Sequence, residues 1–324
     1  EQNSHFVDHY IDMPVDLSEI LFIATANDLS DVSRPLLDRM EIIEVSSYTK
    51  NEKLHIAKEH LVAKQLKKNG LTKKSVRFTD KALAKIIDGY TMEAGVRELE
   101  RMIAAVLRKV VRKNYTVGGV NIEKQIVITD KNLSEYLGKV KFIKEKASRK
   151  NEVGIVRGLA WTAAGGDTLE IEVNVLGGKP ELILTGNMGD VMRESAQIAL
   201  SYVRSVVRKN QIFEENAIHI HIPEGAVPKD GPSAGITMAT AIYSAVTGKP
   251  VDASTAMTGE VTLRGRVMPI GGLKEKLLAA KTAGLKRVLV PLENKSDFEE
   301  EIVQGLEIVY VSDMKEVLKL AIVK

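Results

Sequence analysis

The chain of 324 residues contains no cysteine, a single tryptophan and no long apolar run. The lack of cysteine excludes disulfides, thiol catalysis and cysteine-ligated zinc, and it suits a cytosolic protein. No apolar stretch approaches the roughly 20 residues that a membrane-spanning helix needs. We therefore expect a soluble, cytoplasmic protein without a membrane partner.

The chain also has little net charge. Its 46 basic and 43 acidic residues leave +3, so no overall electrostatic attraction to nucleic acid is expected. Lysines cluster locally at 64–68, 73–74 and 141–150, but no aromatic residues interleave with them to stack on bases. We favour solvated helix faces for these clusters, which leaves DNA as a weakly supported partner.

The glycine-rich phosphate loop Gly-x-x-x-x-Gly-Lys-Ser/Thr is missing, as is the acidic strand end that holds Mg²⁺ in ATPases. Gly248-Lys249-Pro250 lacks both the hydroxyl and the preceding loop. The chain opens at Glu1 without an initiator methionine or a targeting segment. We expect a fragment that neither hydrolyses ATP alone nor binds a cofactor tightly.

What the sequence does contain is a serine among turn-forming residues, Pro228-Lys229-Asp230-Gly231-Pro232-Ser233-Ala234-Gly235, followed by an apolar segment typical of a helix. A serine hydroxyl is a weak nucleophile until a base takes its proton. No histidine stands near Ser233 in the usual elbow pattern. Helix capping is the commoner role of such a serine, so the nucleophile has to be judged together with its base.

Lys276 is the candidate base. The segment 271–280 predicts a glycine turn followed by a helix, and at about 100° per residue Lys276 shares a face with Ala280 and Ala283. Burial on that small-residue face would lower the lysine pKa from about 10.4 toward neutrality. A serine and a lysine are a known nucleophile and base pair. From the residues alone, this dyad and the structural alternative, a capping serine together with a solvated lysine, are about equally open.

Three ordered blocks, 228–235, Thr258-Gly259-Glu260 and 271–280, resemble the signature of the ATP-dependent Lon protease family. The resemblance implies that Ser233 and Lys276 form the catalytic dyad and that Thr258 hydrogen-bonds the lysine. It implies a serine endopeptidase acting through an acyl-enzyme in a ring of identical subunits, expected to be a hexamer. Its substrates would be unfolded or damaged proteins, in quality control and the stress response.

The N-terminal part resembles an AAA+ ATPase. The apolar run from Ile20 to Asn27 predicts a buried parallel strand that delivers Asn27 to a site, similar to the sensor-one strand. Arg39 matches the arginine finger and Arg97 matches the sensor-two arginine. The resemblance implies that these residues sense nucleotide in the full-length parent, whose cofactors would be ATP and Mg²⁺. Without it, each arginine is more simply a surface ion-pair partner.

These patterns predict a multidomain fold with α/β and α+β parts. We expect an AAA+ α/β remnant over 1–47, a helical AAA+ lid over 48–143, a charged linker over 144–153 and a mixed α+β Lon-type proteolytic domain over 154–324. Helical spacing covers 51–68, 79–90, 96–113 and 191–208. Strands are expected at 169–175, 182–184, 218–222, 287–291 and 308–311.

The strand at 218–222 carries the strongest rival interpretation. Alternation places His219 and His221 on one face, where they could bind zinc or where His221 could be the base for Ser233. No further metal ligands stand in a recognisable pattern, so we expect no metal.

Asp230 and Glu260 either tune Lys276 or merely cap and pair. An unpaired carboxylate beside the lysine would raise its pKa and oppose base function. Two other classes stay open: a non-proteolytic AAA+ remodelling or DNA-associated module with an inactive C-terminal domain, and a serine-histidine hydrolase that uses His221.

Overall fold

The computed structural model describes the chain except residues 1, 2, 11, 27, 28, 30, 31, 44, 46, 117, 118, 121, 123, 143–149, 163, 164, 208–210, 224–227, 298–303 and 324. The chain divides into two compact units, residues 1–46 and residues 47–324. The predicted linker falls mostly on 143–149, outside the described residues. The domain boundaries drawn from the sequence stay predictions.

The first unit holds little regular structure. It contains a short turn of helix, η1 (Asn3–His5), a two-stranded pair of β1 (Phe6–Val7) and β2 (Pro14–Val15), and α1 (Arg34–Leu37). The predicted buried strand is wrong for the described residues 20–26, which form no strand and in which Leu21 is 84% exposed. A buried parallel strand needs hydrogen-bonded strands beside it, and the described part of this unit supplies none at that position.

The second unit begins with a helical region that has its own core. Its helical elements are α2 (Lys50–Ile56), the π-helical turn η2 (Ala57–Leu61), α3 (Val62–Lys68), α4 (Asp80–Tyr90), α5 (Arg97–Lys113) and α6 (Leu133–Leu137). Thr49 and Thr79 cap α2 and α4 through their hydroxyls. The predicted apolar face of α5 is confirmed, since Leu99, Ile103 and Val106 are fully buried.

Short strands accompany the helices of this region. The parallel pair consists of β3 (Val76–Phe78) and β6 (Ile126–Ile128), and the antiparallel pair consists of β4 (Tyr115–Thr116) and β5 (Gly119–Val120). Val76, Phe78 and Ile128 are buried in the helical core. These strands therefore belong to the helical region.

The C-terminal region is built on a seven-stranded mixed sheet in the order β15-β14-β11-β7-β8-β10-β9. The strands are β7 (Ile155–Thr162), β8 (Gly165–Gly177), β9 (Leu182–Thr185), β10 (Asn216–His221), β11 (Thr255–Met257), β14 (Arg287–Pro291) and β15 (Glu307–Val311). The predicted strands are confirmed, apart from shifts of one or two residues at some ends and a much longer β8. β7 and β8 form a long antiparallel hairpin in which Trp161 lies opposite Gly166.

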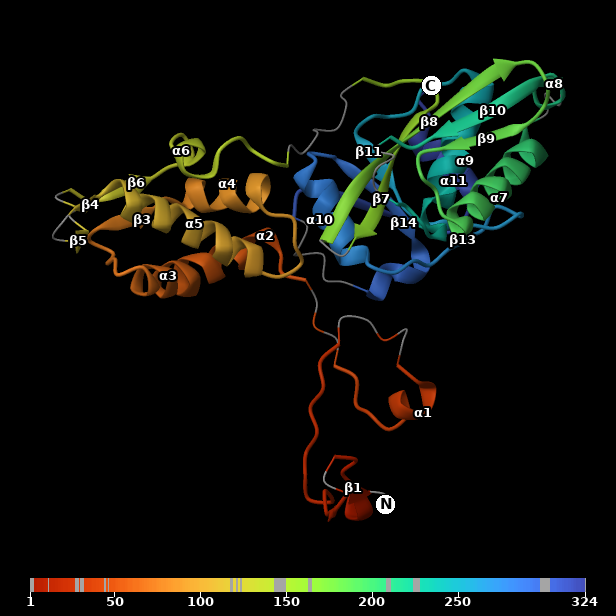
Figure 1. The fold of residues 1–324 in the computed structure, drawn as a ribbon. Helices are drawn as coiled ribbons and strands as arrows, with labels where there is room; N and C mark the ends of the chain where they lie inside the picture. Colours follow the sequence, from red (N-terminus) through yellow and green to blue (C-terminus); the bar gives the residue numbers. More distant parts are fainter. Residues whose placement is uncertain are drawn as a thin grey trace. The chain divides into compact units, whose positions relative to one another are not determined.

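Helices cover both faces of this sheet (Figure 1). One face carries α7 (Asp190–Val206), α9 (Gly235–Thr247) and α11 (Met314–Ala321), and the other carries α10 (Leu273–Thr282). Strand alternation explains the two cores, because Leu289 of β14 packs in the first while Val288 and Val290 pack in the second. The remaining elements are α8 (Gln211–Glu214), the hairpin of β12 (Glu260–Val261) and β13 (Val267–Met268), η3 (Pro232–Ala234) and η4 (Leu292–Ser296).

The architecture confirms a multidomain fold with mixed α and β parts. None of the helices in the described part of the chain is both long and apolar enough to cross a bilayer.

Candidate active site

Ser233 lies in η3, the tight turn that leads into α9. Gly231 begins this turn with φ +119°, a conformation that side chains with a Cβ rarely adopt. Pro232 follows and fixes the first residue of the turn. Because α9 is buried along most of its length, the half-buried serine stands at the end of a helix that is anchored in the core.

The middle block is hydrogen-bonded to the serine turn. The Ser233 carbonyl accepts the Gly259 N–H at 2.8 Å and the Thr258 hydroxyl at 3.3 Å, and the Ile236 N–H donates to the Gly259 carbonyl at 3.1 Å. Thr258 is fully buried and its own N–H donates to Leu289 of β14. The family resemblance implied a bond from Thr258 to the lysine, whereas in this structure the threonine hydroxyl holds the serine backbone.

Lys276 lies on the buried face of α10, as the helical periodicity predicts. Its residue is 2% exposed, and Leu273, Leu277 and Ala280 are buried on the same helix. Within the part of the chain that the structure describes, the Lys276 ammonium has no hydrogen bond or ion pair. Burial therefore lowers the pKa of Lys276 from 10.5 to about 8, because an apolar environment disfavours the charged form.

The serine turn and the lysine helix meet on one strand, since η3 and α10 both pack against β7. Among the described residues no hydrogen bond joins Ser233 Oγ to Lys276 Nζ. Catalytic hydrogen bonds commonly tighten only when substrate is bound. The structure thus provides a serine on a hydrogen-bonded turn and a desolvated lysine on a neighbouring helix.

Asp230 caps a helix. Its carboxylate accepts the Met192 N–H in the first turn of α7 and the Gly231 N–H, both at 2.9 Å. Gly189 at the start of α7 allows this approach, because a Cβ there would lie 2.4 Å from the Asp230 carboxyl carbon. The capping role left open by the sequence is the one observed, and it anchors the serine turn to α7.

Glu260 lies half-buried on β12, opposite Met268. Its side chain has no hydrogen bond or ion pair within the described residues. The lowered pKa of Lys276 is caused by burial, so neither Glu260 nor Asp230 is needed to explain it.

The two histidines of β10 share a face, as alternation predicted, and both contact Thr185 of β9. His219 Nε2 and His221 Nδ1 lie 2.9 Å and 2.7 Å from the Thr185 hydroxyl. In the described ranges neither histidine is hydrogen-bonded to Ser233. Nor does any group of three or more His, Cys, Asp or Glu residues there have an arrangement that could hold a metal ion.

The residues predicted to sense nucleotide are placed unevenly. Asn27 lies outside the described residues, while Arg39 is exposed just after α1 and Arg97 is exposed as the first residue of α5. Sequence reasoning missed Glu93, whose two carboxylate oxygens accept the N–H groups of Glu98 and Leu99 at 2.8 Å and 2.7 Å. This carboxylate caps the helix that carries Arg97.

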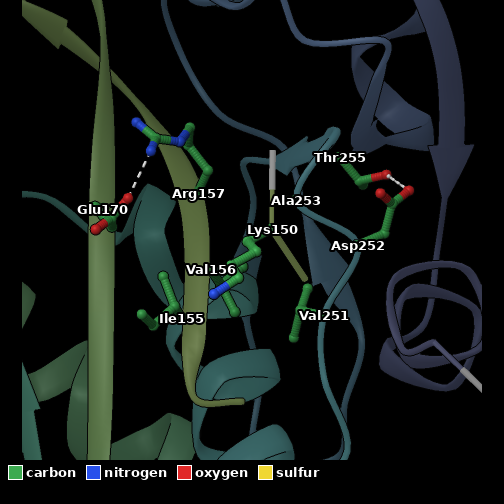
Figure 2. A pocket seen from close by; sticks show the side chains of 9 residues that line it. All are labelled: Lys150, Ile155, Val156, Arg157, Glu170, Val251, Asp252, Ala253 and Thr255. Carbon is green, nitrogen blue, oxygen red and sulfur yellow. Dashed lines mark hydrogen bonds and ion pairs between the residues drawn. The ribbon is translucent and has the colours of Figure 1, made fainter. Parts of the chain in front are cut away.

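Two small hollows of the C-terminal region lie apart from these residues. The cavity in Figure 2 lies beside the Arg157–Glu170 ion pair of 2.5 Å and the Thr255–Asp252 hydrogen bond of 2.8 Å. Its volume of about 20 Å³ has room for about one water molecule. A second hollow of about 160 Å³, between β9 and α7, is lined by Leu182, Leu200 and Phe213. Neither is lined by a candidate site residue.

Comparison with known protein families defines the class of protein to which this chain belongs. Residues 127–324 match the family model of the Lon protease (S16) C-terminal proteolytic domain, and residues 67–119 match that of the Lon protease AAA+ ATPase lid domain. The chain therefore joins an AAA+ lid domain to a peptidase domain.

The chain belongs to the Lon protease family. It is similar to the Lon protease of Lachnoclostridium phytofermentans (57% identity, all of this chain, 45% of the relative). It is also similar to the Lon protease of Bacillus thuringiensis (55%, all of this chain, 41% of the relative) and to Lon protease 1 of Bacillus subtilis (53%, all of this chain, 42% of the relative). The chain thus spans less than half the length of these relatives.

Proposed function

We propose that this chain supplies the proteolytic and lid domains of an ATP-dependent serine endopeptidase, with Ser233 as nucleophile and Lys276 as general base. One observation carries the proposal: Lys276 is buried without a charge partner among the described residues, on a helix that packs against the same strand as the serine turn. The family's proteolytic domain covers both residues.

The chemistry follows from the state of the lysine. Neutral Lys276 takes the proton of Ser233 Oγ, which attacks the peptide carbonyl, and backbone N–H groups of the serine turn stabilise the oxyanion. The Lys276 ammonium then protonates the leaving amine. Water attacks the acyl-enzyme while Lys276 takes its proton, and the lysine returns this proton to the departing Ser233 Oγ. A pKa of about 8 suits this exchange, because a general base works best when its pKa is near the operating pH.

The supporting residues hold the nucleophile in place. Thr258 and Gly259 fix the Ser233 carbonyl, and Asp230 ties the turn to α7. Positioning of this kind makes a large contribution to rate, because a small displacement of a reacting group is costly. We assign Glu260 and His221 no direct part in proton transfer.

ATP and Mg²⁺ would be bound by the full-length protein. Arg39 and Arg97 suit contact with phosphate oxygens, because both are exposed and neither forms an ion pair within the described residues. With Asn27 they would sense nucleotide across a ring of identical subunits, expected to be a hexamer. The chain lacks the phosphate loop and would not hydrolyse ATP alone.

The substrates we propose are unfolded or damaged proteins, degraded in the cytoplasm as part of quality control and the stress response. The lid match and the relatives named Lon protease support this assignment. DNA binding by the lysine clusters is the weaker part of the proposal.

The test is hydrolysis of a fluorogenic peptide and of unfolded casein by the full-length natural protein with ATP. The wild type is compared with Ser233→Ala, Lys276→Gln and His221→Ala. We expect loss in the serine and lysine variants and retained hydrolysis in His221→Ala. Full activity in Lys276→Gln with loss in His221→Ala would establish the serine-histidine hydrolase instead. If the function of the full-length protein is unchanged in Ser233→Ala, the chain is a non-proteolytic module.

A further inference from the structure

Strand β8 approaches the backbone of the lysine helix very closely at Gly166. A Cβ built on Gly166 would lie 1.9 Å from the Glu275 carbonyl oxygen and 2.9 Å from the Lys276 amide nitrogen. Real Cβ atoms essentially never come within 3.0 Å of such atoms. The strand and helix backbones therefore meet here with no side chain between them.

The neighbouring strand β7 contacts the start of the same helix. Trp161 of β7 lies opposite Gly166, and a Cβ on Gly272 would lie 2.9–3.1 Å from three atoms of the Trp161 side chain. Gly272 caps α10 with φ +67°. The cross-strand pair Trp161–Gly166 thus contacts α10 at both ends of its first turn, at Gly272 and at Glu275–Lys276.

We propose that Gly166 is a positioning residue for Lys276, because the missing side chain seats α10 close enough to β8 to keep the lysine buried. This inference rests on the proposed function, since it concerns how the proposed base is prepared.

The cost of a side chain at this place can be read from the contact. Ordinary contacts of a Cβ begin at 3.4 Å, so a methyl group on Gly166 would require the Glu275 carbonyl to retreat by about 1.5 Å. Retreat of α10 from β8 admits water to Lys276 and weakens the desolvation that lowers its pKa. The pKa then rises from about 8 toward the ordinary value of 10.5.

Charged residues on the elements packed here do not account for the state of Lys276. They are Lys274, Glu275 and Lys281 on α10, Arg157 on β7, Asp167, Glu170 and Glu172 on β8, Arg287 on β14 and Glu307 on β15. Arg157 is paired with Glu170 and Arg287 with Glu307. Burial is the cause of the lowered pKa of Lys276, so a displaced helix acts through hydration.

The test is the pH dependence of kcat for peptide hydrolysis by the full-length natural protein carrying Gly166→Ala. Gly271→Ala is the matched control, because Gly271 adjoins Gly272 but has open space where its Cβ would be. In Gly166→Ala we expect the ascending limb to move up by about one to two pH units, which lowers the rate near pH 7.5 by about 10- to 100-fold. The rate recovers at higher pH, and Gly271→Ala follows the wild type.

A second readout comes from Trp161, the only tryptophan of the chain. Its emission should shift in Gly166→Ala and stay unchanged in Gly271→Ala. An ascending limb that stays at the wild-type pH in a folded Gly166→Ala protein, even with a uniformly lower rate, would overturn the positioning role.

Thermal unfolding shows which variants fold. Should Gly166→Ala fail to fold, Trp161→Ala takes its place, because it removes the contact with Gly272 without adding an atom. It is expected to move the limb in the same direction by a smaller amount, and an unmoved limb there would overturn the proposal.

Failure of the proposed function is seen separately, because Lys276→Gln would then retain hydrolysis. If Lys276→Gln is inactive and the ascending limb of the pH profile does not move in Gly166→Ala, the proposed dyad is retained and the positioning role of Gly166 is contradicted.

Discussion

The lid region and the proteolytic region each bury a lysine on a helix, and they treat it differently. Lys53 of α2 is 9% exposed and donates to the backbone carbonyl of Glu93. Lys276 of α10 is 2% exposed and its ammonium has no partner in the described part of the chain. A buried ammonium is costly unless it is hydrogen-bonded or paired. The missing partner, more than burial itself, therefore distinguishes a lysine that can serve as a base.

The largest expected difference between the two lysines is in activity. Lys276→Gln should lower kcat/KM for peptide hydrolysis by about 10²–10⁴-fold, the usual contribution of a general base. Lys53→Gln should stay within about threefold, because Lys53 donates to Glu93 in the lid region and the variant removes no group of the proposed dyad. The proposed difference between Lys276 and Lys53 is contradicted if both variants remain folded and lose activity equally.

The next effect is on stability, where the two lysines should act with opposite signs. Lys276→Met should raise the free energy of unfolding at pH 7 by about 3 kcal/mol, at about 1.4 kcal/mol per unit of pKa shift. Lys53→Met should lower it by about 1–3 kcal/mol, because the Glu93 carbonyl loses its donor.

The sign for Lys276 follows from proton linkage. Its folded pKa of about 8 lies below the ordinary 10.5, so between these values the unfolded chain binds more protons and stability rises with pH. Below pH 8 the buried ammonium of Lys276 lowers the free energy of unfolding by its full cost. Above pH 10.5 this cost is absent, because the lysine is neutral in both the folded and the unfolded chain. Urea unfolding at pH 7 and pH 9.5 should show the gap between wild type and Lys276→Met narrowing. A gap that does not change with pH would mean that the lysine is not desolvated.

A smaller effect is expected at the two acidic caps. Asp230→Ala and Glu93→Ala should each lower stability by about 1 kcal/mol, the usual loss when a helix cap is removed. Only Asp230→Ala should also lower kcat, by roughly tenfold, because Asp230 anchors the serine turn. Asp230→Asn keeps an acceptor oxygen and serves as the control. Equal kcat values in Asp230→Ala and Glu93→Ala would remove the anchoring role.

The smallest effect is expected at the histidines of β10. His221→Ala should change kcat/KM at pH 8 by about twofold, because an effect near 0.5 kcal/mol is typical of residues outside the site and His221 bonds to Thr185. A loss in His221→Ala comparable to that in Lys276→Gln would count against the lysine as the base.

Much of this site follows from local sequence. The helix face of Lys276 and the strand face of His219 and His221 depend on periodicity over a few residues, and both are observed. The turn around Ser233 was recognisable from its glycine and prolines. The order of the three blocks predicts that these segments act together.

What the sequence did not reveal depends on contacts between distant segments. Gly166 matters because of Glu275, and Asp230 because of Met192, and no local pattern pairs them. The run from Ile20 was misjudged for the same reason, since its composition fits a buried strand but the described residues beside it provide no sheet. Periodicity predicts which face is apolar, whereas burial requires a partner.

The most direct test of the central claim is a titration of the Lys276 side-chain nitrogen by NMR in the folded protein. Labelled lysine would be used, with the Lys276→Gln spectrum to assign the signal. The account predicts a midpoint at a pH of about 8, so that part of the amine is already neutral just below that pH. A midpoint near 10.5 would contradict it, because Lys276 would then be a solvated cation and no base for Ser233.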